Sequence, residues 1–335
     1  MTATVQNIPP SAFMQAAMGM QHSSVIRAAV ELDIFTTIHT GRRTAAELAA
    51  ETGASPKGMR VLCDALTIQG LLLKNDGEYS LSPEAAVYLD RNAPSWIGSV
   101  ALFLTSTMMT SAFQHFTDAV RHGGTVEGRM GSIEPDHPVW IEFARWMAPM
   151  MTPPARALTE LAGPVTKVLD IAAGHGVFGI EFAKANPTAE VHALDSRGVL
   201  DLAEENAVLA GVGERWHRID GSAFDADFGA GYDVVLCPNF FHHFDREQCV
   251  QLARKAHAAL QADCGRMLTL EFVPNDDRVT PAQSAWFATI MLATTPQGDA
   301  YTFSEYQQIF REAGFSHSEL AAPRGAAQQV IISTK

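Results

Sequence analysis

The sequence has no apolar run long enough to cross a membrane, because none reaches the ~18 residues that a spanning helix needs. Its first residues, MTATVQNIPPSAF, lack the basic start and apolar core of a secretory signal. It also has few cysteines, and Cys63, Cys237, Cys249 and Cys264 show no paired spacing, so we expect no disulfide framework. These absences predict a cytoplasmic protein with no membrane partner.

Basic residues are also scarce. Lys and Arg number 24 against 37 Asp and Glu, giving a formal net charge of −13, and no basic cluster offsets it locally. Such a chain repels phosphate backbones, so we expect no nucleic-acid partner. What the sequence does have is length and apolar content. Its 335 residues, of which 47% are hydrophobic and 18% charged, exclude a disordered chain and suffice for two domains.

The first part of the chain predicts a winged helix. From Ser11 to about Ile38, apolar residues recur at helical spacing. The stretch from Thr44 to Leu48 opens a short helix like a capping box, and Ser55-Pro56 starts a second one. The segment LLLKNDGEYSLSP then has strand-like runs on either side of Asp76-Gly77, a pair that favours a hairpin.

A winged helix invites a DNA-binding interpretation. The second short helix, however, offers only Lys57 and Arg60 in its first turns, and phosphate anchoring normally uses several basic contacts. We therefore favour a dimerisation module whose long first helix packs against a partner chain. A metabolite-sensing regulator that binds a duplex is the alternative.

The middle of the chain is rich in apolar helix patterns. A first pattern runs from Pro94 to Met130, and a second, VWIEFARWMAPMM, runs from Val139 to Met151 just before Pro153. Its aromatic and methionine side chains have two interpretations. Ordinary core packing is favoured for any single one, whereas the cluster as a whole also suits an adaptable pocket for a flat apolar ligand.

From Thr166 onward, strand-like and helix-like segments alternate, which predicts a parallel sheet. The chain departs from this pattern at its end. After the helix SEYQQIFREAG come two strand-like runs, FSHSELAA and AAQQVIIS, joined by PRG. They predict a terminal hairpin that adds an antiparallel strand to the sheet.

The stretch KVLDIAAGHGVFG, from Lys167 to Gly179, reads as a buried strand, a glycine turn and the start of a helix, which together form a nucleotide cradle. Its glycines match the dinucleotide fingerprint, and Asp195, 19 residues after Gly176, would bind a ribose hydroxyl of either NAD or S-adenosylmethionine. Asp170, before the turn, would face a cationic group but oppose a pyrophosphate. Together with the mid-chain position of the turn and the terminal hairpin, it favours the methyl donor.

Residues 11–335 resemble the small-molecule O-methyltransferases typified by plant caffeic acid and acetylserotonin O-methyltransferases and by bacterial polyketide tailoring enzymes. The resemblance rests on NFFHHFDREQC, on LEFVPND and on MLATTPQGDAYTFSEYQQIFREAGF. It implies an α/β fold of the class I methyltransferase type: a Rossmann-like seven-stranded sheet with an antiparallel C-terminal hairpin, preceded by an all-α winged-helix dimerisation domain.

The same resemblance implies a division into three parts and a homodimer. Residues 11–93 would form the winged-helix dimerisation domain, 94–155 a helical connector that contributes to the substrate pocket, and 156–335 the S-adenosylmethionine-binding Rossmann-like domain.

Site residues follow from the resemblance position by position. It implies His242 as the catalytic base and Glu271 as the carboxylate that orients it, with His243 as the competing histidine. No third ligand lies at a recognisable spacing from this histidine pair, so we expect no metal. The cofactor would be S-adenosyl-L-methionine, leaving as S-adenosyl-L-homocysteine. The residues implied for the donor are Asp170, Gly174, Gly176, Asp195, Asp220, Ser222 and Phe224, and those for the acceptor are Phe143, Met147, Asn239 and Met291.

Three positions depart from the family pattern: Ala172 stands where glycine is common, Ser222 where an acid is common, and Ala300, next to Asp299, where plant members have a second carboxylate. The expected activity is methyl transfer to a hydroxyl of a small aromatic or polyketide-like molecule. Carbon or nitrogen methylation, or a non-methylating use of the cofactor, are the alternatives within this fold.

Overall fold

The computed structural model describes residues 11–39, 41, 43–128, 130–133, 139–321 and 328–335. The chain divides into two compact units, Met1–Ser106 and Thr107–Lys335. The expected three-part division, 11–93, 94–155 and 156–335, is finer than this and stays a prediction. Among the described helices, none is long and apolar enough to cross a membrane.

The N-terminal unit begins with three helices, where the sequence predicted one continuous helix. They are α1 (Ser11–Ala17), α2 (Gly19–Glu31) and α3 (Ile34–Ile38). The prediction was wrong at Asp33, whose φ of 54° is left-handed and whose carboxylate accepts a hydrogen bond from Thr36 Oγ1 at 2.7 Å. Aspartate tolerates this conformation and competes locally with the helix for hydrogen bonds, so the helix ends there.

The winged helix follows, and its turn chemistry confirms the prediction. Helix α4 (Ala45–Thr52) begins with a capping box between Thr44 and Glu47, and α5 (Pro56–Ile68) is capped by Ser55. Strands β1 (Arg43–Thr44), β2 (Leu72–Asn75) and β3 (Glu78–Leu81) form a small sheet in the order β1-β3-β2. Helices α6 (Pro83–Tyr88) and α7 (Ser99–Leu104) complete the unit.

The second unit opens with α8 (Thr107–Gln114), α9 (Phe116–His122) and α10 (Val139–Ala162). Two predictions need correction here. The apolar stretch 94–130 is broken into short helices, and the helix predicted to end near Met151 continues to Ala162 through Pro149, Pro153 and Pro154. Each proline removes one backbone donor, and burial of Ala155, Leu158 and Ala162 in the core compensates for the loss.

The sheet of this unit has seven strands in the order β6-β5-β4-β7-β8-β10-β9. The first five are parallel: β4 (Lys167–Ile171), β5 (Glu190–Asp195), β6 (Trp216–Asp220), β7 (Val234–Pro238) and β8 (Arg266–Glu271). Strand β10 (Gln329–Thr334) pairs antiparallel with both β8 and β9 (His317–Ala321). The predicted terminal hairpin is therefore present, although its PRG connection lies outside the described residues.

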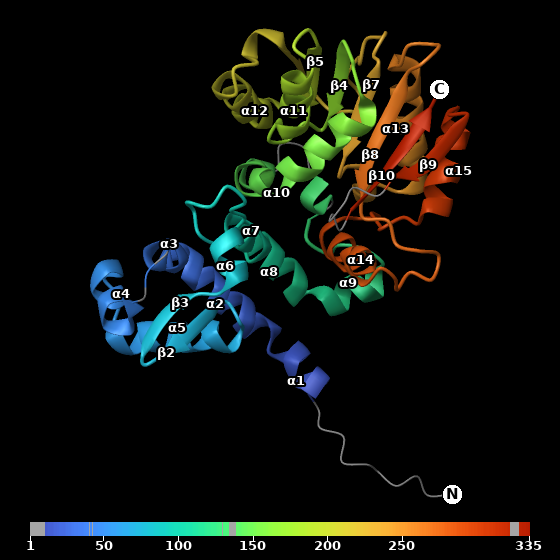
Figure 1. Cartoon of the computed structure of the whole chain (residues 1–335). Helices are drawn as coiled ribbons and strands as arrows, with labels where there is room; N and C mark the ends of the chain where they lie inside the picture. The colour runs from blue at the N-terminus through green and yellow to red at the C-terminus, as the bar shows by residue number, and fades with distance from the viewer. Residues whose placement is uncertain (1–10, 40, 42, 129, 134–138, 322–327) are drawn as a thin grey trace, which may run out of the picture. The chain divides into compact units, whose positions relative to one another are not determined.

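Helices cover both faces of the sheet (Figure 1). Helices α10, α11 (Val177–Ala185) and α12 (Arg197–Leu209) share one core with Val168 and Val191, and α13 (Arg246–Ala259) and α15 (Phe303–Ala313) share the other with Leu169 and Ile171. Adjacent residues of β4 thus face opposite cores. In such a fold the loops at the carboxyl ends of the parallel strands meet at one edge, where ligands bind.

Candidate active site

The glycine turn between β4 and α11 has three residues in the left-handed region: Ala172 (φ 55°), Gly174 (φ 57°) and Gly176 (φ 76°). A Cβ at Gly176 would lie 3.2 Å from Ala203 and from Trp216, so this glycine allows close helix packing. A Cβ at Gly174 would meet only the Ala172 carbonyl oxygen, at 3.8 Å. The turn is therefore open at Gly174, where a ligand can approach the backbone.

Asp170 lies beneath the turn and is fully buried. Its Oδ2 accepts a hydrogen bond from Gly179 N at 2.9 Å, whereas its Oδ1 finds no hydrogen-bond partner among the described residues. Burial raises the pKa of this carboxyl to about 7, and the negative charge of Asp195 adds to the effect. The turn thus rests on an acid with unused hydrogen-bonding capacity.

Asp195, at the end of β5, ties the turn to the neighbouring strand. Its Oδ2 accepts from Gly174 N at 2.9 Å and its Oδ1 from Ser196 N at 2.7 Å. Burial raises its pKa to about 6, although both of these hydrogen bonds favour the charged form. The carboxylate stands beside the open side of the turn at Gly174.

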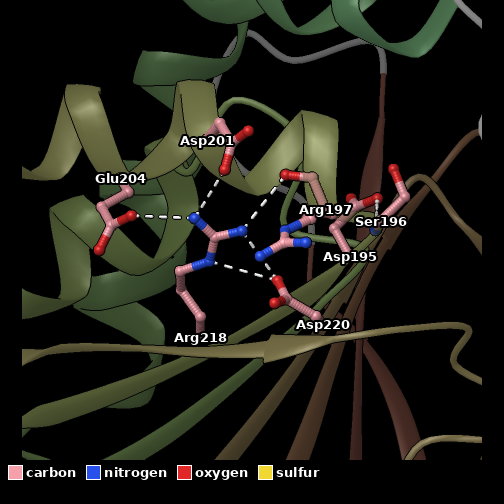
Figure 2. A network of polar contacts seen from close by, with 7 residues as sticks. All are labelled: Asp195, Ser196, Arg197, Asp201, Glu204, Arg218 and Asp220. Atoms are coloured by element: carbon pink, nitrogen blue, oxygen red, sulfur yellow. Dashed lines mark hydrogen bonds and ion pairs between the residues drawn. The ribbon is translucent and has the colours of Figure 1, made fainter.

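The ends of β5 and β6 are side by side, since Asp195 pairs with Asp220 in the parallel register. Figure 2 shows Arg218 reaching from β6 toward Asp220 and toward the two acids of α12. Its guanidinium bonds Asp220 Oδ1 at 2.9 Å, Asp201 at 2.7 Å and Glu204 at 3.0 Å. Asp220 is therefore held in place by an arginine that also pairs with α12.

The loop after β6 carries the other residues expected near an adenine. Ser222 Oγ accepts from Phe224 N at 3.2 Å. The ring of Phe224 packs edge-on against Phe244, with centroids 4.9 Å apart. The loop thereby contacts the segment after β7 that carries the two histidines.

His242 and Glu271 are in direct contact. His242 Nδ1 lies 2.6 Å from Glu271 Oε2, and both side chains are buried, at 5% and 0% exposure. Because an ionised carboxylate only accepts, this contact orients an Nδ1–H toward Glu271 and directs Nε2 away from it. Glu271 Oε1 also accepts from Phe240 N at 3.0 Å, which fixes the carboxylate against the loop.

His243 has a different environment. Its ring centroid lies 4.3 Å from that of His242 and 5.1 Å from that of Trp140, which meets it edge-on. Its Nδ1 is buried and has no hydrogen-bond partner in the described part of the chain. Burial, and then the charge of His242, hold the pKa of His243 well below its usual range. His243 is thus a neutral, weakly basic neighbour of His242.

Asp299 does not replace the second carboxylate. Its backbone N–H donates to the His242 carbonyl oxygen at 3.0 Å, while its side chain pairs with Arg278 at 3.1 Å. Ala300, at the position of the family's carboxylate, is buried. Glu271 is the acid that contacts the His242 ring.

The residues expected at the acceptor come from α10, from α14 (Ala282–Thr294) and from the segment after β7. Phe143 of α10 stacks on His175 of the glycine turn, with centroids 6.3 Å apart, while Met147 and Met291 are buried. Asn239 donates through Nδ2 to Met151 Sδ at 3.5 Å, and its Oδ1 accepts from Gln328. The amide of Asn239 is therefore already engaged by the protein.

Two further aromatic residues of this region were not expected from the sequence. Phe287 of α14 (Ala282–Thr294) packs edge-on to His242 at 4.7 Å, and Trp140 packs against both His243 and Phe143. A signal existed, since Phe287 lies four residues before Met291 and Trp140 three before Phe143, spacings that share a helix face. Within the described residues, no group of three or more His, Cys, Asp or Glu could hold a metal ion.

Comparison with known proteins identifies both parts of the chain. Residues 14–91 match the model of the O-methyltransferase dimerisation domain, and residues 147–316 match that of the O-methyltransferase domain. The 3-hydroxy-5-methyl-1-naphthoate 3-O-methyltransferase of Streptomyces sahachiroi is 27% identical over 316 residues, covering 92% of this chain and 90% of that protein.

Solved structures agree. A crystal structure of a candidate O-methyltransferase from Nostoc punctiforme superposes with a TM-score of 0.95 at 45% identity, covering 98% of this chain and 100% of that one. Human N-acetylserotonin methyltransferase, in complex with SAM, superposes with a TM-score of 0.85 at 20% identity, covering 100% and 99%, which shows the shared fold alone. With the methyltransferase model matching half of its residues and the dimerisation model most of its N-terminal unit, this chain belongs to the O-methyltransferase family.

Proposed function

We propose that this protein transfers a methyl group from S-adenosylmethionine to a hydroxyl oxygen of a small aromatic or polyketide-like molecule. The observation that carries the proposal is the buried contact between His242 Nδ1 and Glu271 Oε2, at the same sheet edge as the open glycine turn. Family membership supports the reaction type, and the naphthoate substrate in the name of the Streptomyces relative supports the acceptor class.

The residues of the turn fit S-adenosylmethionine. Asp170 and Asp195 put carboxylates below and beside the turn, which suits the amino and ribose groups of this ligand and opposes a pyrophosphate. The open space beside Gly174 lets a ligand approach the backbone closely. Asp170 Oδ1, which has no hydrogen-bond partner among the described residues, can accept a hydrogen bond from that ligand. When bound, the donor supplies a methyl group already activated by its sulfonium.

The protein's own residues would bind the donor, orient the acceptor and remove the proton from its hydroxyl. Asp195 would hold the ribose end, and Asp220, Ser222 and Phe224 would flank the adenine. His242 Nε2 would take the proton of the acceptor hydroxyl, the group to which the donor would supply its methyl before leaving as S-adenosylhomocysteine. Glu271 keeps the imidazole in the required tautomer and stabilises its charged form. His243 is the weaker candidate base because it lacks a partner carboxylate among the described residues and its pKa is lowered.

The acceptor would lie between α10 and α14, against Phe143, Met147, Asn239 and Met291. Aromatic and methionine side chains suit a flat ring, since they offer polarisable surface and adapt to its outline. Trp140 and Phe287 extend this wall beside the two histidines.

The N-terminal unit would form a homodimer. Its match to the dimerisation-domain model supports this, as do the exposed apolar side chains on α1 and α2, with Phe13 at 70% and Met20 at 73% exposure. Light scattering in solution should give twice the mass of one chain, whereas a monomer would contradict the proposal.

The base assignment predicts a separation of binding from chemistry. His242→Ala should lower turnover by about 10²–10⁴-fold, the usual contribution of general-base catalysis, and leave the affinity for S-adenosylhomocysteine within about twofold. Methyl transfer from labelled donor to a panel of hydroxynaphthoates and hydroxyindoles measures the first, and calorimetry the second.

Exposed His217, paired with Glu190 on the outer strands, supplies the matched control, because His217→Ala should retain turnover. Full turnover of the His242→Ala protein would overturn the base. Label on carbon or nitrogen in place of oxygen would overturn O-methylation and leave the donor assignment standing.

A further inference from the structure

Lys255 of α13 holds the loop that follows β6. Its Nζ donates to the carbonyl oxygens of Ala223, Phe224 and Ala226 at 2.8, 2.7 and 2.9 Å. An ammonium group has three protons, so the three carbonyls use its full donor capacity. Nζ also lies 4.5 Å from the ring centroid of Phe228, in the geometry of a cation–π contact.

The loop is folded around this ammonium as a single turn. Backbone N–H groups of Asp225 and Ala226 donate to the Ser222 carbonyl at 3.1 and 2.8 Å, and Ser222 Oγ accepts from Phe224 N. The carbonyls of the turn would otherwise repel one another, since their dipoles converge on one point. The partly buried ammonium of Lys255 at that point offsets the repulsion. Lys255 and the hydrogen bonds within the turn thus hold residues 222–226 together.

Charge and burial act on Lys255 in opposite directions. Burial lowers its pKa, while the negative charges of Asp225 and Asp227 in the same loop raise it. The two acids thus help to keep the ammonium charged and hydrogen-bonded to the loop carbonyls.

We infer that Lys255 is a positioning residue for the adenine end of the methyl donor. It acts through Phe224, whose carbonyl it holds and whose ring packs on Phe244, and through Ser222, which closes the same turn. The inference rests on the proposed function, because it takes these two residues as neighbours of the adenine. It gives α13 a role in selecting the donor, through a lysine that lies outside the sequence motifs.

The matched control is a second lysine that contacts the chain between β6 and β7. Lys167, the first residue of β4, donates to the Ala230 carbonyl at 2.7 Å and lies 4.5 Å from the ring of Tyr232. Lys167 thus binds the end of the segment that leads into β7 through the same kinds of contact. It lies, however, at the amino end of the parallel strands. Replacing either lysine should lower the overall stability of the protein, whereas only the replacement of Lys255 should weaken adenine recognition.

The test is calorimetric titration of the full-length protein with S-adenosylhomocysteine and with S-inosylhomocysteine, in which an oxo group replaces the adenine amino group. Lys255→Met should weaken binding of S-adenosylhomocysteine by about tenfold, the cost of a lost charged hydrogen bond, and reduce its preference over the inosyl analogue. Lys255→Arg should recover most of the affinity, and Lys167→Met should stay within about twofold of wild type.

Lys255→Met affinity and preference equal to wild type would overturn the inference, and so would equal losses in the two methionine variants. If Lys255→Met does not fold, Lys255→Gln takes its place, and an affinity and preference equal to wild type in that variant would refute the role. A wild-type protein that binds neither ligand would refute the proposed donor itself, a separate outcome.

Discussion

Ala172 carries the clearest conformational cost at the scale of a single residue. Its φ of 55° lies in the left-handed region, which costs an L-residue with a β-carbon about 1–2 kcal/mol. Ala172→Gly should therefore raise the free energy of unfolding by about 0.5–1 kcal/mol after the entropy cost of glycine is subtracted. Urea unfolding measures this change.

The adjacent Ala173 is the control, since it is buried and has no positive φ. Ala173→Gly loses a buried methyl group and gains unfolded-state entropy, and should lower the free energy of unfolding by about 1 kcal/mol. The same sign for both variants would show that Ala172 is not strained.

The sequence predicted individual residues well where two strands or a motif bring them together. Glu271 and His242 lie in contact, as their places in the motifs implied, and Asp195 and Asp220 lie in register. It could not predict that Asp170 has no solvent exposure, because burial depends on how α11 packs over the strand. Trp140 was missed because its spacing from Phe143 puts both on one helix face but does not distinguish a pocket from ordinary core.

At the scale of elements, strands were easier to predict than helices. Most of the parallel strands were recognisable because they are short, largely apolar runs, and helices follow β4, β5 and β7. Helix lengths were harder. A polar Asp33 ends one helix through a left-handed turn, while α10 continues through three prolines because its far end is buried. Both outcomes depend on tertiary packing, which overrides local propensity.

The connection between α14 and α15 positions the histidine loop through close backbone approach. A Cβ on Gly298 would lie 2.3 Å from the His242 carbonyl oxygen and 2.5 Å from Thr295 Oγ1. Gly298→Ala should therefore push His242 away from its place and lower turnover by about tenfold or more, since a displacement near 1 Å can cost as much as 10²-fold. Affinity for S-adenosylhomocysteine should change little.

Gly198→Ala is the matched control for this prediction. A Cβ there would meet only Ile141 Cδ1, at 3.6 Å, which is ordinary contact. Its turnover should equal that of wild type. Equal turnover in the Gly298→Ala enzyme would show that the connection yields without moving the histidine.

At the scale of the whole molecule, the buried acids beneath the turn link stability to pH. Asp170 has a pKa of about 7 in the folded protein against an ordinary value of 3.8. The native state therefore binds this proton more tightly than the unfolded state does. The contribution of Asp170 to stability is full below about pH 4 and is lost as the pH rises through 7. Asp195, with a pKa of about 6, acts in the same direction.

Buried histidines act in the opposite direction. Burial lowers the pKa of His175 to about 4, so its contribution is present above about pH 6.5 and is lost as the pH falls through 4. The pH profile of the wild-type protein sums these effects. The contribution of Asp170 must therefore be measured as a difference between two proteins that share the same histidines.

Asp170→Asn removes the titrating group and keeps an oxygen that can accept from Gly179 N. Between pH 4.5 and 7.5 the wild-type protein should lose stability relative to this variant, by an amount on the order of 3 kcal/mol. Urea unfolding at a series of pH values measures the difference, with Asp263→Asn, at an exposed position, as the control that should run parallel to wild type. Parallel profiles for wild type and Asp170→Asn would show that Asp170 stays ionised throughout. Saturating S-adenosylhomocysteine should reduce the stability difference between the two proteins, because it stabilises the charged carboxylates at neutral pH.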